Sequence, residues 1–193
     1  MTGGVIKKST KKSIRITDIF EYLDLPAFDN IEIGGTFTGN FETFFHTANG
    51  VIANNGRQFV RLPVNEKLSW HYHPKPYGIW PSFEDMIDGK LNRHKFSTSL
   101  IFNRLGVWCL SMKKEQLQDV TFVSGLHEMW VHFHQFLLKY RRQLDDDDTG
   151  TQYEEHFETW ANHLRSFNYD IWFIKRNDIH NLAPLMKAVN NRA

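Results

Sequence analysis

The amino-acid sequence predicts an α/β protein of the α+β type, with a strand-rich first part and a mainly helical second part. The composition is that of a globular chain, since 41% of its 193 residues are hydrophobic and 23% are charged. β-branched and aromatic runs, broken by Gly-Gly and Asn-Gly pairs, fill residues 30–63 and indicate antiparallel strands. Apolar residues at helical spacing fill residues 125–144 and indicate a long helix.

The first part of the chain is expected to begin with a helix and continue as strands. Residues 17–28 form the helix, with Asp18 at its amino-terminal cap and Pro26 as its stop. The strands of residues 30–63 follow. Residues 66–74 then alternate between two faces, which predicts a further strand.

The spacing of apolar residues and the turn residues also predict the remaining helices and strands. Residues 82–94 are expected to form a helix, and residues 95–112 two strands that turn near Asn103 to Gly106. After the long helix of residues 125–144 come a second helix, a short strand and a terminal helix, at residues 151–167, 169–176 and 182–189.

Three regions are expected along the chain. Residues 1–14 are rich in lysine and predict a flexible basic tail. Residues 15–120 form the core, and residues 121–193 form a mainly helical extension packed on that core. The apolar residues of this extension also suit an interface with a second copy or with another protein.

Charge and cysteine content narrow the function classes. The formal net charge is only +1, so no global field favours nucleic acid or an anionic membrane surface as a partner. The chain has one cysteine, Cys109, in an apolar run where we expect a buried and unreactive thiol. No secretion signal or membrane span is apparent, which predicts an intracellular, cytoplasmic protein.

The stretch "HYHPKPYGIWPSFED", residues 71–85, carries the candidate site. On a strand, His71 and His73 point to one face, while Trp70 and Tyr72 point to the other, which we expect to be core. Two imidazoles on one face, with Asp85 as an oxygen donor, can hold a tetrahedral Zn²⁺ whose fourth position stays open to water.

Each half of this pattern has an ordinary alternative. The chain has 10 histidines, and a second such pair, His132 and His134, occurs elsewhere. Ser82 and Asp85 also fit a helix capping box, which requires no metal. The complete pattern, with a proline directly after the second histidine, is far rarer by chance than either half.

The complete pattern resembles the signature of the JAMM (JAB1/MPN/Mov34) metalloproteases, which have an upstream glutamate, then HxHP, then SxxD. The matching residues are Glu32, His71, His73, Pro74, Ser82 and Asp85. The segment "EIGGTFTG", residues 32–39, has the glycine spacing that surrounds the family's glutamate. The loop before Ser82 is one residue longer than is usual in the family. The likeness covers about residues 15–112, and it implies an MPN/JAMM-like, cytidine-deaminase-like mixed central sheet flanked by helices.

The resemblance also implies a mechanism and a substrate. His71, His73 and Asp85 would bind Zn²⁺, Glu32 would act as the general base, and Ser82 would stabilise the oxyanion. The substrate would be an isopeptide bond of ubiquitin or a ubiquitin-like conjugate. Tyr77 and Trp80 are candidates to line the groove for the modifier's tail.

Several alternatives stay open from the sequence. Glu42 or Glu66 could take the role of the base in place of Glu32. The protein could be a non-catalytic MPN-like scaffold, or a viral or phage structural or regulatory protein that acts through protein contacts. The acidic run of residues 145–150 resembles a calcium loop, although a solvated loop fits it better because its last ligand position holds His156.

Overall fold

The computed structural model describes residues 12–52, 58–60, 67–74, 80–87, 96–141 and 151–190. The strands are β1 Lys12–Arg15, β2 Ile33–Phe37, β3 Thr43–Asn49, β4 Val51–Ile52, β5 Gln58–Phe59, β6 Leu68–Tyr72, β7 Phe96–Asn103, β8 Gly106–Lys113 and β9 Asp170–Lys175. The helices are η1 Ile16–Asp18, α1 Ile19–Leu23, η2 Pro26–Phe28, α2 Phe83–Ile87, α3 Lys114–Gln118, α4 Val120–Arg141, α5 Thr151–Ser166, η4 Arg176–Asn181 and α6 Leu182–Asn190.

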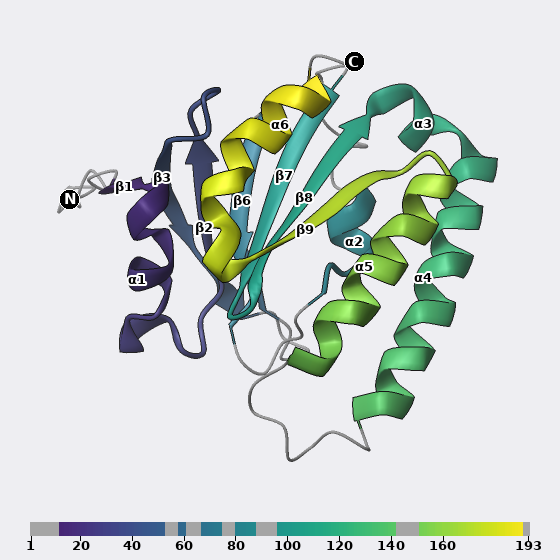
Figure 1. The fold of residues 1–193 in the computed structure, drawn as a ribbon, viewed down its shortest axis with the longest axis horizontal. Coiled ribbons are helices and arrows are strands. Elements are labelled where there is room, and N and C mark those ends of the chain that lie inside the picture. Colours follow the sequence, from purple (N-terminus) through teal and green to yellow (C-terminus); the bar gives the residue numbers. More distant parts are fainter. Residues whose placement is uncertain are drawn as a thin grey trace, which may run out of the picture.

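Seven strands form one mixed, open sheet in the order β1-β3-β2-β6-β7-β8-β9. β6 and β7 are parallel, and every other neighbouring pair in this sheet is antiparallel. The connection between the two parallel strands contains α2. The α/β fold expected from the sequence is confirmed at this level, with β6 close to the centre of the sheet (Figure 1).

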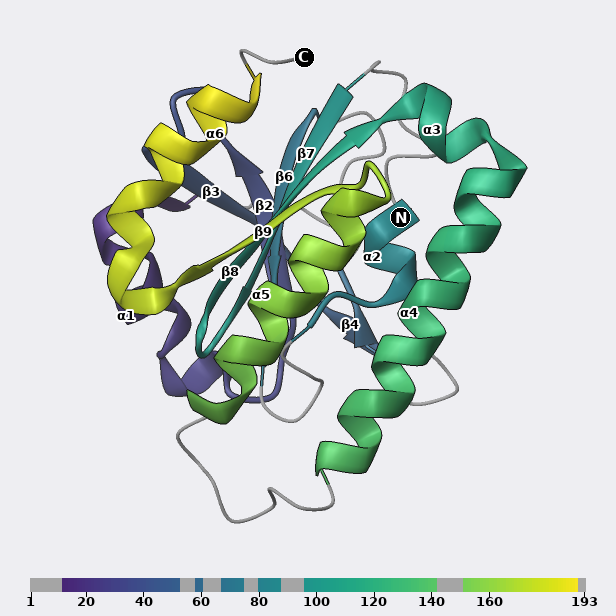
Figure 2. The ribbon, with the colours of Figure 1, turned by 45° about the vertical axis from the view of Figure 1, so that its right-hand side comes forward.

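Helices cover both faces of the sheet (Figures 1 and 2). One face packs against α1 and α6, through a core that includes Trp70 and Phe102. The other face packs against α2, α3, α4 and α5, through a core that includes Trp108 and Leu126. Neighbouring residues of one strand therefore belong to different cores, as strand geometry requires.

The amino-terminal region differs in part from the expectation. Residues 12–14, expected as the end of a flexible tail, lie in β1, which pairs with β3 at the edge of the sheet. Residues 1–11 lie outside the described part of the chain. Asp18 does stand at the amino-terminal cap of α1, but its carboxylate bonds Arg15 and Thr17 in place of the helix N–H groups.

The hairpin between β7 and β8 turns where the sequence indicates. The side-chain oxygen of Asn103 accepts hydrogen bonds from the backbone N–H groups of Leu105 and Gly106. Gly106 is required at this point, because a Cβ there would lie 2.1 Å from the backbone oxygen of Ile174 on β9.

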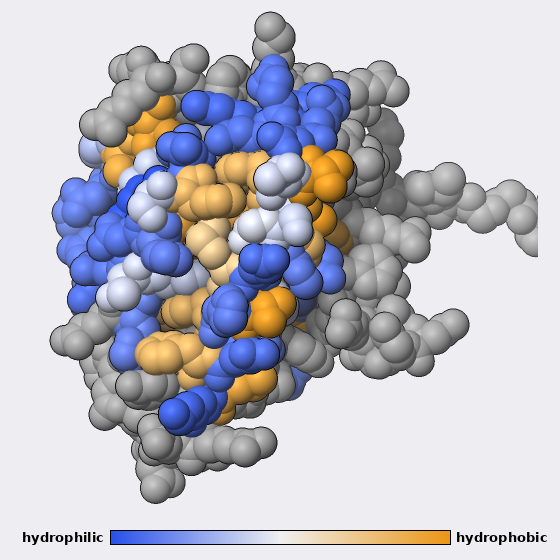
Figure 3. Space-filling model, turned by 90° about the vertical axis from the view of Figure 1, so that its right-hand side faces the viewer, coloured by the Kyte–Doolittle hydropathy of each residue, from blue (hydrophilic) through white to orange (hydrophobic). Residues whose placement is uncertain are grey.

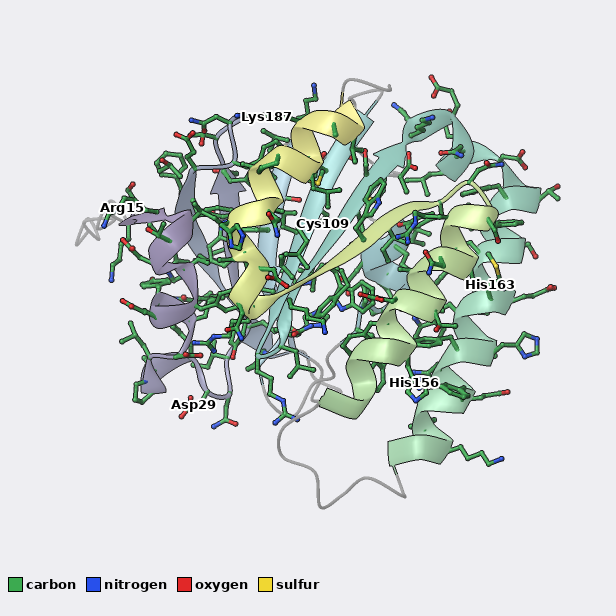
Figure 4. All side chains as sticks on the ribbon, in the orientation of Figure 1. Arg15, Asp29, Cys109, His156, His163 and Lys187 are labelled. Carbon is green, nitrogen blue, oxygen red and sulfur yellow. The ribbon has the colours of Figure 1, made fainter. Side chains whose placement is uncertain are left out.

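The carboxy-terminal part is more than a helical extension. Its strand β9 pairs with β8 along residues 170–175 and completes the sheet. α5 and α6 follow the expected helices, whereas α3 and the first turn of α4 occupy residues 114–124, where the sequence analysis placed no helix. Figure 4 shows Cys109 on β8 in the sheet, where the side chain is fully buried as expected.

The outer side of α4 exposes apolar side chains between polar ones (Figure 3). Val120 is 80% exposed, and Phe136 and Leu138 are also exposed. In the described parts of the chain, no helix combines the length and the apolar character that crossing a membrane requires.

Candidate metal centre

β6 and the residue after it hold the two histidines of the candidate site in the middle of the sheet. His71 pairs with Gly34 of β2 on one side and with Ile101 of β7 on the other. His73 follows the strand, and its backbone N–H donates to the Phe102 carbonyl at 2.8 Å. Both imidazoles are buried on the face covered by α2, as the alternation of the strand predicts.

Three side chains bring their ligand atoms together at this point. The Nε2 atoms of His71 and His73 are 3.0 Å apart. The carboxylate of Asp85 lies 3.2 Å from Nε2 of His71 through Oδ1 and 3.5 Å from Nε2 of His73 through Oδ2. This is the one group in the described residues whose His, Cys, Asp or Glu atoms could together hold a metal ion.

These distances fit a small tetrahedral ion. Bonds of roughly 2.0–2.1 Å to nitrogen and oxygen place two ligand atoms of a tetrahedral zinc about 3.3 Å apart. The observed separations of 3.0, 3.2 and 3.5 Å bracket that value. The donor set and its spacing therefore suit zinc, and similar borderline divalent ions share the preference for imidazole nitrogen.

The first turn of α2 fixes the Asp85 carboxylate. The backbone N–H of Ser82 donates to Oδ2 of Asp85 at 2.7 Å. In return, the backbone N–H of Asp85 donates to the Ser82 hydroxyl at 3.1 Å. This is the capping box that the sequence suggests. A carboxylate has lone pairs for both tasks, so capping the helix and binding a metal are compatible roles for Asp85.

For Asp85 and His73, two of the three ligands, the surroundings favour the form that binds a metal. Burial alone would raise the pKa of Asp85, but His71, His73 and the Ser82 N–H together hold it well below its usual range. Burial lowers the pKa of His73 to about 4, against the opposing effect of Asp85. Near neutral pH the carboxylate is therefore ionised and the His73 imidazole is neutral, as metal coordination requires.

Glu32 lies beside this group, directly before β2. β2 and β6 are antiparallel, and Ile33 lies opposite Tyr72. The residue before Ile33, which is Glu32, therefore lies at the level of His73, the residue after Tyr72. Ile33 belongs to the core of the opposite face, so Glu32 projects to the face of the histidines. Burial raises its pKa to about 7, with His71 lowering it and Asp85 raising it further. A carboxyl with this pKa can exchange a proton near neutral pH.

No family model, curated protein or solved structure matches this chain.

Two glycines let β2 lie close to its neighbours. A Cβ on Gly35 would lie 1.8 Å from the backbone oxygen of Phe45, and a Cβ on Gly34 would lie 2.7 Å from that of Trp70. The pairing of β2 with β3 shifts between these two glycines, which marks a bulge. The extra residue of this bulge, Thr47, lies on β3.

The remaining candidate residues differ in where they lie, and some lie outside the described part of the chain. Trp80 is half-buried, and the edge of its ring packs against His134 of α4, with the centroids 6.1 Å apart. Glu42 is exposed at the start of β3, where its carboxylate accepts a hydrogen bond from Asn40. Tyr77 and Glu66 lie outside the described residues, as does the acidic run of residues 145–150.

One residue at the site was not anticipated. Trp130 of α4 donates its indole N–H to the backbone oxygen of Pro81, directly before Ser82, at 3.1 Å. The sequence shows only an aromatic residue in the apolar pattern of a helix. Nothing in that pattern indicates where the indole N–H will lie.

Proposed function

We propose that this protein is a zinc-dependent peptidase of the JAMM type that hydrolyses isopeptide bonds of ubiquitin or ubiquitin-like conjugates. The observation that carries the proposal is the buried convergence of His71, His73 and Asp85 with Glu32 on the same face. Two imidazoles, one carboxylate and an adjacent titratable carboxyl are the parts that metal-assisted hydrolysis needs.

Zinc is the preferred ion because three protein ligands leave one position open. Catalytic zinc sites characteristically have three protein ligands and a water, whereas structural sites have four. When bound, zinc supplies a water whose pKa is lowered to about 7 and polarises the carbonyl that is attacked.

The chain's own residues then perform two tasks. Glu32 accepts the proton of the attacking water and delivers it to the nitrogen of the leaving amine. Its raised pKa suits both steps, because the group must be ionised first and protonated afterwards. The hydroxyl oxygen of Ser82 accepts a hydrogen bond from the backbone N–H of Asp85. The hydroxyl hydrogen is then free to donate a hydrogen bond to the oxyanion that develops on the substrate.

The substrate class rests on the resemblance of the HxHP and SxxD pattern to the JAMM family. An isopeptide bond joins a flexible carboxy-terminal tail to a lysine side chain, and both parts must reach the buried histidines. Trp80 is half-buried, two residues before Ser82, and we keep it as a candidate to contact such a tail. Tyr77 keeps its place as a candidate for the same groove.

The first experiment is to measure bound zinc after purification without added metal or chelator. The wild type is expected to carry about one zinc per chain, and a His71→Ala/His73→Ala variant none. A matched control replaces His132 and His163, two exposed helix histidines, and should retain the metal. A folded wild type that takes up no zinc, even when zinc is offered, would overturn the proposal.

Activity is tested next on ubiquitin and ubiquitin-like conjugates. Zinc-loaded wild type should release the modifier, and Glu32→Gln should bind zinc but lose at least about 100-fold in rate. Zinc binding without cleavage of any conjugate would favour the non-catalytic scaffold, in which the metal has a structural role only.

A further inference from the structure

The long helix α4 packs against the turn that precedes α2. Rings of the helix and rings of the turn meet in one cluster, with Trp130 stacked on His134 at 4.8 Å and Phe83 packed edge-on against His127 at 4.7 Å. Trp80 also packs against His134, with the ring centroids 6.1 Å apart. These contacts hold the segment of residues 80–83 against α4.

Within this contact, a hydrogen bond connects α4 to the metal centre. The Trp130 indole N–H donates to the Pro81 carbonyl, and the next N–H along the chain, that of Ser82, donates to Asp85 Oδ2. The Pro81 carbonyl and the Ser82 N–H belong to the same peptide group. Because a peptide group is planar, fixing its carbonyl also fixes the direction of its N–H. Asp85 then presents its carboxylate to His71 and His73.

We propose that Trp130 is a positioning residue for the metal centre, acting through the Pro81–Ser82 peptide on the Asp85 carboxylate. This inference rests on the metal site of the proposed function, but not on its substrate or its chemistry. It gives the long helix α4 a part in the site, although α4 supplies no ligand. The effect is directional, because two hydrogen bonds in series through one peptide polarise and orient each other.

Loss of the indole N–H would leave the Pro81 carbonyl without this donor at a buried position. The peptide would then be free to rotate toward another donor, and the Ser82 N–H would turn with it. Asp85 would keep its charge but lose its fixed orientation, so the metal would bind to a site that must first be reordered.

Trp130→Phe tests this inference, because it removes the N–H and keeps an aromatic ring in the cluster. Trp160→Phe is the matched control. Trp160 lies in α5, in the same helical layer, and its indole N–H is buried without a hydrogen-bond partner among the described residues. Zinc affinity is measured by competition with a chromophoric chelator, and the unfolding midpoint is measured in excess chelator.

Trp130→Phe is expected to weaken zinc binding about fivefold, less than the roughly 10–100-fold typical of groups that contact a ligand directly. Trp160→Phe should leave zinc affinity unchanged. With Co²⁺ in place of zinc, the visible absorption bands, which report ligand geometry, should shift in Trp130→Phe only. Replacing Trp130 by benzothienylalanine, which keeps the indole shape and loses only the N–H, should reproduce the effect, and it replaces the phenylalanine variant if that one fails to fold.

The outcomes separate this inference from the proposed function. If the wild type binds no metal, the proposed function fails first. If the wild type binds zinc and neither Trp130 substitution changes the affinity or the Co²⁺ spectrum, the positioning role is wrong. An equal loss in Trp160→Phe would also overturn it, because the effect would then come from loosening of the helical layer.

Discussion

The two faces of β6 are equally buried but differ in chemistry. On one face, Trp70 and Tyr72 are 0% and 7% exposed, and Trp70 packs against two other aromatic rings. On the other face, His71 and His73 are each 8% exposed, and their nitrogens face a carboxylate. Burial alone does not mark a functional site. The difference lies in whether the buried atoms are satisfied by packing or converge on a point that a ligand can fill.

The largest expected effect comes from breaking the packed face. Trp70 is fully buried, and its indole N–H contacts the carbonyl oxygens of Thr36 and Phe45 at 3.2 and 3.3 Å. Trp70→Ala should lower the free energy of unfolding by about 4 kcal/mol, through lost contacts and the cavity left behind. Urea unfolding measures this loss. A cost below about 1 kcal/mol would mean that this face is not the core.

The second effect comes from the histidine face and appears only with metal. Zinc at about 100 times its dissociation constant should stabilise the wild type by about 2.7 kcal/mol. A His71→Ala/His73→Ala variant should show no zinc-dependent shift in its melting temperature. In excess chelator the variant should be close to the wild type in stability, unlike Trp70→Ala. A variant that melts much earlier even in chelator would show that the histidines are structural.

The third effect is a pH dependence of folding stability on the histidine face. Burial raises the pKa of Glu32 to about 7 from an ordinary value of 4.5, so the folded protein binds this proton more tightly than the unfolded chain does. The associated stability is present below about pH 4 and is lost as pH rises through about 7. Glu32→Gln has no such loss. In chelator it should therefore gain about 3 kcal/mol on the wild type between pH 4 and pH 8.

Denaturant unfolding across this pH range measures the gain. Glu42→Gln, at an exposed position, is the matched control for the change of glutamate to glutamine. Parallel stability curves for Glu32→Gln and the wild type would contradict the buried, proton-binding character assigned to Glu32.

The smallest effect is expected at Cys109, on the packed face. Burial raises the pKa of this thiol, so the reactive thiolate is suppressed in the folded protein. A thiol-specific disulfide reagent should label it only in denaturant. Cys109→Ala should leave zinc affinity unchanged, because the side chain lies on the opposite side of the sheet from the histidines. Rapid labelling of the native protein would contradict this placement.

Local patterns in the sequence account for much of the candidate site. The alternation of β6 places His71 and His73 on one face, and the spacing of Ser82 and Asp85 predicts their capping box; the structure confirms both. These features depend on residues close together in the chain. Local patterns alone did not point to Glu32, which was selected through the family resemblance. Its approach to the histidines depends on the register between β2 and β6, two strands far apart in the sequence.

The features that were not predicted depend on distant parts of the chain. Residues 12–14 read as the end of a charged tail, yet with Arg15 they form β1 because β3 offers an unpaired edge. Trp130 has the periodicity of an ordinary core residue, and its bond to Pro81 exists only because α4 lies over the turn before α2. No local pattern records such contacts, which the tertiary fold alone creates.

The late position of β9 in the chain has a consequence for synthesis on the ribosome. The ligands on β6 and α2 emerge early, but the strand that completes the sheet and the helix that holds the Ser82 turn emerge only with the second half of the chain. A nascent chain would therefore carry His71, His73 and Asp85 before their final arrangement is enforced. Metal loading at full affinity is thus expected only after α4 and β9 have been synthesised and have packed on the sheet.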